Sequence, residues 1–348
     1  MNLASLTAGS ITSIEHLEDL LSTPTPLVID VMRQTPGDLI VLGVAGKMGP
    51  TLARMAKRAS DAAGVPRRII GVARFSSPEA ADELAQDGIE AIRCDLLDAA
   101  ALATLPDAPN VIFMAGRKFG STGRESLTWA MNVHVPALVA QRYAGSRIVA
   151  FSTGNVYGLA PVGQGGSVET DLPQPVGEYA MSCLGRERMF EHFSVTNGTP
   201  TALLRLNYAT ELRYGVLVDL AHRVWQGEAI DVTMGHVNVI WQGDANAMAL
   251  SALAHASTPP FIVNLAGPEE LSVRQTCEAL GRAMGVPVRF TGEEARDALL
   301  SNGSLGHTRL GAPTVTAAQL IGWTADWVRR GGATLDKPTH FESRDGGF

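Results

Sequence analysis

Short apolar runs alternate with longer amphipathic segments along most of this chain. The apolar runs are typical of buried strands, and the segments between them have the periodicity of helices with one buried face. Regular alternation of this kind predicts the α/β class, with a doubly wound, largely parallel sheet. Strands are expected at 38–43, 68–74, 89–94, 111–115, 147–152 and 201–205, with helices at about 47–61, 78–86, 124–144 and 177–193.

The same pattern divides the chain into three parts. Residues 1–37 are an extension before the first strand, with a short helix expected at 13–21. Residues 38–208 carry the regular alternation and are expected to form the core. After that the pattern loosens, so 209–348 is expected to be mainly a smaller C-terminal substrate-binding lobe. Within it, 244–266 is expected to return to the core as a helix and a strand; the lobe should also contain a helix at 213–226 and a strand at 237–241.

Composition narrows the class of protein. The chain has 348 residues, of which 45% are hydrophobic, enough for a large buried core. The net charge of −7 without a basic cluster argues against a nucleic-acid partner. Cys94, Cys183 and Cys277 are far apart and are expected to be reduced thiols. Without the plan of a signal peptide or an apolar run of membrane length, the expectation is a cytoplasmic protein with no membrane partner.

A glycine-rich turn after the first strand is the strongest motif. Gly43, Gly46 and Gly49 are spaced three residues apart, with Lys47 and Met48 between the last two, and a helix follows. Glycines there allow the chain to turn tightly and approach a pyrophosphate, which the N–H groups of the helix end then bind. The turn predicts a Rossmann-type site for a nicotinamide dinucleotide.

The end of the second strand bears on which dinucleotide is bound. A carboxylate at this place binds the adenosine ribose of NAD, whereas an arginine accommodates the 2′-phosphate of NADP. This chain has Arg74 there and no carboxylate, which favours NADP slightly over NAD. The alternative is that Arg74 is only a solvated charge and that other groups hold NAD.

The motifs in this order resemble the extended short-chain dehydrogenase/reductases, the NAD-dependent epimerase/dehydratase family. The resemblance covers about 38–270. It implies that Asp95 and Leu96 contact the adenine and that Ala115 and Gly116 pass beside the ribose and phosphates. Leu206 and Asn207 would close over the nicotinamide. The matching segments are the glycine turn, Asp95-Leu96, Ala115-Gly116, Asn132-Val133, the run from Phe151 to Gly158, and Arg205-Leu206-Asn207.

The resemblance also implies the reacting groups. Thr153 would be the catalytic hydroxyl, Asn155 would lie beside the substrate, and Asn132 would brace the site. Tyr179 corresponds to the tyrosine that exchanges a proton with the substrate. The lysine one helical turn later is missing, however, and Cys183 takes its place.

A tyrosine has a pKa near ~10, and the family lysine lowers it. Three explanations for its absence remain open. Another cation, Arg186 or Lys118, reaches the site; Tyr179 acts only as an acid or hydrogen-bond donor; or the protein binds cofactor without turnover. Cys183 as a nucleophile is a further possibility, although packing is the more ordinary role of such a residue.

The substrate is expected to be a small hydroxylated molecule, a sugar or a sugar acid. The basic loop 116–124, containing Lys118, could bind a carboxylate or phosphate together with Arg205 and Arg213. The alternative is that the loop contacts cofactor phosphate or solvent. The histidines lack the spacing of metal ligands, so no metal is predicted.

The functional prediction is therefore an NAD(P)-dependent oxidoreductase or epimerase with Tyr179 as the proton-transfer residue. The alternatives are an NADPH-dependent carbonyl or enone reductase and a non-catalytic, redox-sensing dinucleotide-binding protein. The turn and 70–74 also resemble plant progesterone/iridoid enone reductases, which use NADPH. A homodimer is implied only by the family resemblance.

Overall fold

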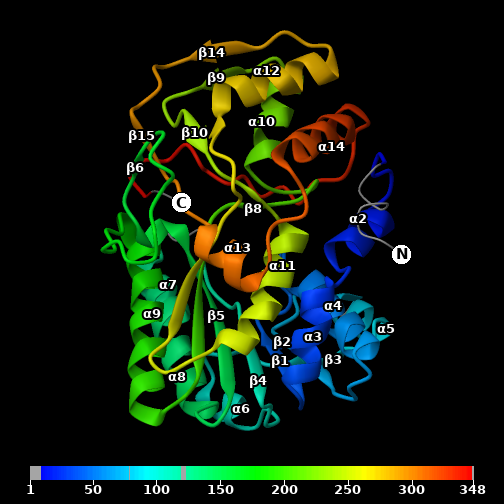
Figure 1. The fold of residues 1–348 in the computed structure, drawn as a ribbon, viewed down its shortest axis with the longest axis vertical. Helices are drawn as coiled ribbons and strands as arrows, with labels where there is room; N and C mark the ends of the chain where they lie inside the picture. Colours follow the sequence, from blue (N-terminus) through cyan, green and yellow to red (C-terminus); the bar gives the residue numbers. More distant parts are fainter. Residues whose placement is uncertain (1–8, 78, 119–122, 347–348) are drawn as a thin grey trace.

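The computed structural model describes residues 9–77, 79–118 and 123–346, and it centres on a parallel sheet (Figure 1). The sheet has seven strands in the order β12-β7-β5-β4-β1-β2-β3, all parallel to their neighbours. The doubly wound α/β fold predicted from the sequence is confirmed. The strands are β1 Leu39–Leu42, β2 Ile69–Ala73, β3 Glu90–Arg93, β4 Asn110–Phe113, β5 Arg147–Thr153, β7 Thr201–Leu206 and β12 Phe261–Leu265.

Strand β1 explains why the central strands are continuously apolar. Leu39 and Val41 pack into the hydrophobic cluster on one face of the sheet, whereas Ile40 and Leu42 pack into the cluster on the other. A strand covered on both faces needs apolar side chains at every position.

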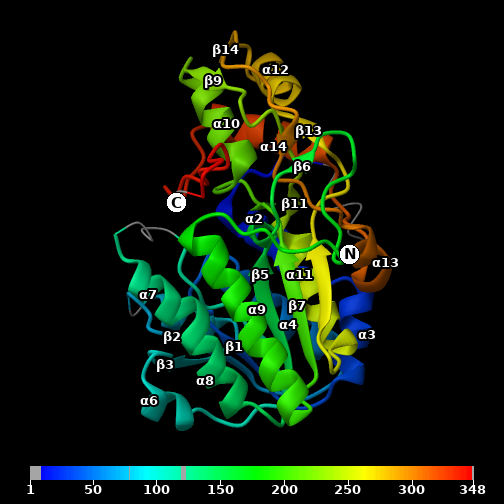
Figure 2. The same cartoon turned by 90° about the vertical axis from the view of Figure 1, so that its left-hand side faces the viewer.

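Helices cover both faces of the sheet, as Figure 2 shows, with α8 and α9 on one side and α3, α4 and α11 on the other. The helix expected at 124–144 is interrupted by a π-helical turn, η1, over Ala130–His134. The helices that flank the sheet are α3 Pro26–Gln34, α4 Gly49–Ala62, α5 Glu79–Gln86, α6 Ala99–Ala103, α7 Glu125–Trp129, α8 Val135–Arg142, α9 Gly177–Asn197 and α11 Gln242–Ser251, which continues into η3 Ala252–His255.

The N-terminal extension forms two helices, although the sequence analysis predicted only one. The first, α2 Ile14–Leu21, is capped by the Ser13 side chain, which accepts a hydrogen bond from His16 N. The second, α3, begins at Pro26 after Thr25, whose hydroxyl accepts from Val28 N. Its start signal was present in the sequence, because proline suits the first turn of a helix.

The segment 244–266 supplies α11 and β12, and α13 Ser304–Leu310 packs against both, while most of the rest of 209–346 builds the lobe above the carboxyl edge of the sheet. Its core includes the edge-to-face pair Trp241–Trp323, with ring centres 5.7 Å apart. The elements of the lobe are β8 Ala209–Thr210, α10 Val216–Trp225, β9 Ala229–Asp231, β10 His236–Val237, β11 Ile240–Trp241, β13 Leu271–Ser272, α12 Val273–Met284, β14 Arg289–Thr291, β15 Asp297–Ala298 and α14 Ala317–Arg329; η2 Gly154–Val156 and β6 Ala160–Pro161 precede them.

The single strand expected at 237–241 is split in two. β10 pairs with β13, and β11 pairs with β8. Between them the buried side chain of Asn238 donates to the carbonyl oxygens of Gly267 and Ser301, at 3.2 and 2.7 Å. This polar anchor breaks the strand that its apolar neighbours suggested.

Residues 331–346, here called the closing segment, run without regular structure beneath the lobe and toward the start of α9 (Figure 2). Leu335 N donates to Arg213 O at 3.0 Å, and Phe341 is buried in the lobe. The closing segment thus forms part of the boundary between the lobe and the core. Across the described ranges, no helix is long and apolar enough to cross a membrane.

Candidate active site

A cavity of about 390 Å³ lies between the carboxyl edge of the sheet and the lobe. Its floor is made by residues that follow β1, β4, β5 and β7, which is where open α/β sheets bind ligands. Its other walls come from α9, the lobe and the closing segment. The lining residues are Gly43, Gly46, Lys47, Met48, Met114, Gly116, Arg117, Lys118, Phe151, Ser152, Thr153, Asn155, Tyr179, Arg186, Leu206, Tyr208, Ala209, Tyr214, Val216, Gln242, Lys337 and Thr339.

The glycine turn has the geometry that a dinucleotide requires. Gly43 has φ +94°, and a Cβ on it would lie 2.6 Å from the backbone nitrogen of Ala115. A Cβ on Gly49 would lie 2.0 Å from Val44 O, so this glycine lets α4 pack against the turn. No side chain caps α4 at Met48. The open helix end and the close-packed turn therefore fit the pyrophosphate of a dinucleotide.

The predicted cofactor residues fall into two groups. Gly43, Gly46, Lys47, Met48, Gly116, Tyr179 and Leu206 line the cavity. The others do not line it: Gly49 and Ala115 support the turn, Arg74, Asp95 and Leu96 lie toward the ends of β2 and β3, and Asn207 is buried beneath the site.

A second arginine, from the neighbouring strand, joins Arg74 at the end of β2. Arg74 is exposed there, and the guanidinium of Arg93, from the end of β3, donates to the carbonyl oxygens of Arg74 and Phe75 at 2.7 and 2.8 Å. Asp95 turns its carboxylate to its own backbone and accepts from Leu97 N at 3.1 Å.

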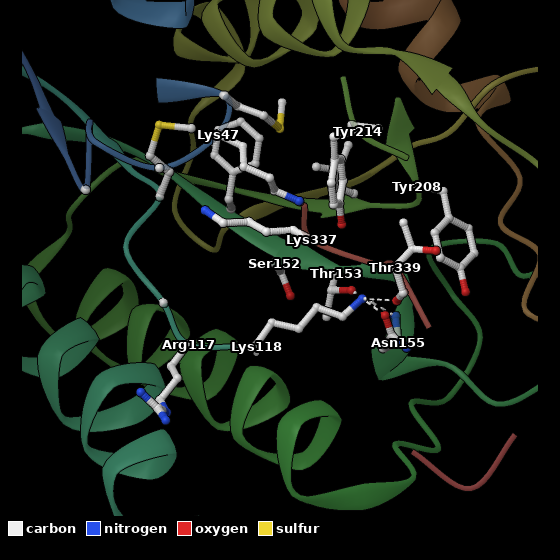
Figure 3. Close-up of a pocket in the computed structure, with 18 of the residues that line it drawn as sticks. Lys47, Arg117, Lys118, Ser152, Thr153, Asn155, Tyr208, Tyr214, Lys337 and Thr339 are labelled. Carbon is white, nitrogen blue, oxygen red and sulfur yellow. Dashed lines mark hydrogen bonds between the residues drawn. The ribbon is translucent and has the colours of Figure 1, made fainter. Parts of the chain in front are cut away.

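Thr153, Asn155 and Tyr179 place three polar side chains in the cavity, and Figure 3 shows the first two beside each other. The Thr153 hydroxyl donates to Asn155 Oδ1 at 2.9 Å, and it also hydrogen-bonds Tyr179. Thr153 ends β5 and Tyr179 lies in the first turn of α9, so strand and helix bring the two hydroxyls together. This is the pair that the sequence motifs predicted.

Tyr179 and Cys183 both hold their protons tightly. Burial, and then the neighbouring Cys183 sulfur, raise the pKa of Tyr179 well above its usual value, while Arg186 opposes that shift. Burial likewise raises the pKa of the Cys183 thiol. Cys183 is fully buried and packs with Val156 and Tyr157, so its surroundings are those of a packing residue and not of a reactive thiolate.

Asn132 connects three parts of the site from inside the π-helical turn. Its Oδ1 accepts from Arg117 N and from Arg186 Nη2, each at 2.8 Å. Its Nδ2 donates to Arg117 O at 3.0 Å and to Ser182 Oγ at 2.9 Å. A π turn of this kind is frequent at functional sites. Asn132 therefore fixes the loop after β4 against α9, next to Tyr179.

Two cations lie near Tyr179. Arg186 lines the cavity from the same helix and donates to Phe151 O at 2.8 Å. Lys118 reaches in from the loop after β4, with its Nζ 5.8 Å from the centre of the Tyr179 ring. Burial lowers the pKa of Lys118 to about 8. The rest of that predicted basic loop, 119–122, lies outside the described residues.

The structure also brings in residues that sequence reasoning missed. Lys337 and Thr339 come from the closing segment, Tyr208 comes from the turn after β7, and Tyr214 comes from the lobe. The Nζ of Lys47 lies 2.9 Å from the centre of the Tyr214 ring. These residues follow no motif, but Lys337 is one of only four lysines in the chain, which is a usable signal.

The expected anion clamp of Arg205 and Arg213 is corrected by their surroundings. Arg205 is buried and forms an ion pair with Glu187 of α9, at 2.8 Å, and it donates to the Tyr157 hydroxyl at 2.7 Å. Arg213 pairs with Glu18 and Glu211, each at 3.0 Å. Neither lines the cavity, because acidic partners elsewhere in the sequence hold both guanidinium groups.

In the described residues, no group of three or more His, Cys, Asp or Glu side chains is placed to hold a metal ion.

The fold and the cavity define a Rossmann-type protein of the nicotinamide-dinucleotide-binding class. Residues 39–210 match the model of the NAD dependent epimerase/dehydratase family. Residues 39–210 are therefore a domain of that family, whose members are NAD-dependent epimerases and dehydratases. The resemblance seen in the sequence motifs is thereby confirmed.

Several solved structures with a similar fold align with this chain over almost their whole length. UDP-glucose 4-epimerase from Thermotoga maritima superposes with a TM-score of 0.70 at 17% identity, covering 84% of this chain and 99% of that one. UDP-glucuronic acid 4-epimerase from Bacillus cereus, solved with UDP-glucuronic acid and NAD, has a TM-score of 0.69 at 17% identity, with 84% and 99% covered. A comparison with curated protein sequences gave no match.

Proposed function

We propose that this protein is an NAD(P)-dependent oxidoreductase or epimerase that acts on a small hydroxylated substrate, a sugar or a sugar acid, with Tyr179 as the proton-transfer residue. The observation that carries the proposal is the meeting of Tyr179 and Thr153 in a cavity floored by a dinucleotide turn. Phenol and hydroxyl together can hold one substrate oxygen inside this cavity.

Lys118 and Arg186 supply the positive charge that the missing lysine would have placed near the phenolate of Tyr179. Both are cationic groups beside Tyr179, and the positive charge of Arg186 already favours its phenolate. Cys183 cannot do this as a neutral thiol. Of the three explanations for the missing lysine, a cation from elsewhere in the chain has the most support.

Each residue then has a defined part in the reaction. When bound, the nicotinamide supplies a hydride to the substrate carbon or accepts one from it. Tyr179 gives its proton to the substrate oxygen, or takes one from it, while Thr153 holds that oxygen in place. Lys118 and Arg186 stabilise the phenolate, and Asn132 keeps Arg186 beside it.

The protonation of Tyr179 favours reduction at neutral pH. Its raised pKa keeps the phenol in the form that donates a proton to a carbonyl oxygen. Oxidation of a hydroxyl needs the phenolate and should be faster at high pH. A carbonyl reductase is therefore the second candidate, and the burial that raises the pKa of Tyr179 is what favours it.

NADP is slightly favoured over NAD as the cofactor because of the basic side chains at the end of β2. Arg74 is exposed there and Arg93 lies beside it, so a 2′-phosphate would meet two guanidinium groups. NAD is the cofactor named with similarly folded structures such as the Bacillus cereus epimerase, and it is the alternative.

Cytoplasmic location and a homodimer stay predictions. Trp129, Met181 and Val195, on α7 and α9, have exposed apolar side chains that a second copy could cover. Size-exclusion chromatography with light scattering would measure the assembly.

The test is Tyr179→Phe, measured both for turnover and for cofactor affinity by calorimetry. Loss of turnover on a panel of keto and hydroxy sugars, with cofactor affinity unchanged, supports the proposed chemistry. Thr153→Val should lower turnover in the same way, without loss of cofactor. A Tyr179→Phe variant with parental turnover would contradict the proposal, and a parent without turnover on any substrate of the panel would favour the redox-sensor alternative.

A further inference from the structure

Lysine is rare in this chain, and most of the lysines lie at one place in the fold. There are 28 lysines and arginines, of which only Lys47, Lys57, Lys118 and Lys337 are lysines. Three of these four line the active-site cavity. The fourth, Lys57, lies on α4 and pairs with Asp61 at 2.6 Å. The ammonium groups of this protein are thus concentrated at the cavity.

The three lysines come from separate elements and point into the same space. Lys47 comes from the glycine turn, Lys118 from the loop after β4 and Lys337 from the closing segment, and Figure 3 shows their side chains extending into one cavity. Their charges act on one another: burial, followed by the charges of Lys118 and Lys337, lowers the pKa of Lys47 to about 6.

The charged side chains in the described lining of the cavity are all basic. Arg117 and Arg186 also line the cavity, and its described lining includes no aspartate or glutamate. Two carboxylates outside the lining act on Lys47, those of Glu211 and Asp219, and they also bind Arg213 and Thr339 respectively. Five basic side chains and no acid make a cavity that favours a ligand with more than one negative charge.

Lys337 is held in this position by the contacts of the closing segment. Thr339 donates through its backbone N and its hydroxyl to Asp219 Oδ2, at 2.8 and 2.6 Å. Farther along, Glu342 pairs with Arg223 of α10 at 2.8 Å. The buried Phe341 lies between these two anchors. Bonds on both sides of Phe341, together with Leu335 N on Arg213 O, fix the path of the chain past the cavity.

We propose that Lys337 is a ligand-binding residue that joins Lys47 and Lys118 in holding a multiply charged anion inside the cavity. The anion is a phosphate-type or carboxylate group, either the pyrophosphate of the dinucleotide or an anionic group of the substrate. This rests on the proposed function insofar as that function places a dinucleotide and an anionic sugar in the same cavity. Lys337 then makes the closing segment part of the binding site.

The experiment compares Lys337→Gln with the parent, using calorimetry and two probes. ADP-ribose, which has the pyrophosphate but no nicotinamide, reports on the cofactor. Inorganic phosphate, titrated into protein saturated with NADP⁺, reports on the substrate side. Lys57→Gln is the matched control, since it removes a lysine outside the cavity. Lys337→Arg keeps the charge and should keep most of the affinity.

Each result has a definite meaning. A roughly tenfold or greater loss of ADP-ribose affinity in Lys337→Gln, absent in Lys57→Gln, supports the proposal and assigns the pyrophosphate. Unchanged ADP-ribose affinity with a similar loss of phosphate binding supports it and assigns the substrate anion. Unchanged affinity for both probes, in a variant with the parental melting temperature, overturns it.

Failure of the proposed function gives a different result. A parent that binds neither ADP-ribose nor any nicotinamide dinucleotide would contradict the dinucleotide site itself. In that case phosphate titrated into the ligand-free parent and into Lys337→Gln still decides the role of Lys337: weaker binding in the variant supports it, and equal binding overturns it.

Discussion

The ammonium group of Lys118 lies 5.8 Å from the centre of the Tyr179 ring, although the two residues belong to elements on different sides of the cavity. Lys118 follows β4, and Tyr179 lies in the first turn of α9. A cation from another part of the chain thus lies near Tyr179. One turn after Tyr179, its own helix has Cys183 where a lysine was expected.

Lys118→Met should lower turnover by roughly tenfold to a hundredfold, because the phenolate of Tyr179 loses a nearby positive charge. Burial lowers the pKa of Lys118 to about 8, so its charge is lost as the pH rises through that value. In the parent, the part of the rate that depends on this charge should fall above pH 8. In Lys118→Arg that fall should disappear, since arginine stays protonated. Rate profiles from pH 6 to 10 would measure this, and identical profiles for all three proteins would rule out the role.

Arg74→Ala should weaken NADP⁺ binding by roughly tenfold and leave NAD⁺ binding unchanged, because only NADP carries the 2′-phosphate that a guanidinium group would contact. Arg93→Ala is a useful companion: its guanidinium also supports the backbone of Arg74 and Phe75, so it should show the same selectivity together with some loss of stability. If Arg74→Ala weakened the binding of NADP⁺ and NAD⁺ equally, Arg74 would not contact the 2′-phosphate.

Lys47→Met should stabilise the ligand-free protein at neutral pH. The folded-state pKa of about 6 lies below the usual value of 10.5, so between these values the unfolded chain binds more protons than the folded one. Lys47 therefore costs stability at pH 7, a cost that shrinks as the pH rises toward 10.5, and its removal should raise the free energy of unfolding by up to a few kcal/mol.

Urea unfolding at pH 7 and pH 10 would test this, with Lys57→Met as the control. The same variant should bind ADP-ribose less tightly, because Lys47 lies in the phosphate-binding turn. A Lys47→Met protein that is less stable than the parent at pH 7 would show that packing against Tyr214 outweighs the charge.

Arg205→Met should destabilise the fold without affecting cofactor affinity. It leaves Glu187 buried without its partner, which typically costs about 3–5 kcal/mol. Arg188→Ala, on the same helix, breaks an exposed pair with Glu191 and should cost at most about 1 kcal/mol. Thermal unfolding and ADP-ribose titration of both variants would measure the difference. A stable Arg205→Met protein with weak substrate binding would restore the anion-binding role that its position argues against.

The parts of the site that the sequence predicted are those determined by local chemistry. The spacing of Gly43, Gly46 and Gly49 and their place between a strand and a helix required no knowledge of distant residues. Thr153 and Tyr179 could be paired because both follow motifs whose order along the chain is fixed by the doubly wound sheet.

The parts that it missed depend on partners far away in the sequence. Arg205 looked available until the fold placed Glu187 against it, and Asn238 broke an apparent strand because Gly267 and Ser301 supply its acceptors. Lys337 belongs to no motif and reaches the cavity only because the closing segment crosses the lobe. The helix α3 is different, since Thr25-Pro26 was a readable start signal.

The double ion pair of Glu18 has a consequence for how the molecule melts. Its two carboxylate oxygens bind Arg54 of α4 and Arg213 of the lobe, at 2.8 and 3.0 Å, while Leu17 and Leu21 on the same helix are buried in the core of the lobe. One helix is thereby bonded to both halves. Calorimetry should record a single cooperative transition, because neither half can lose its structure without breaking the contacts that hold this helix to the other.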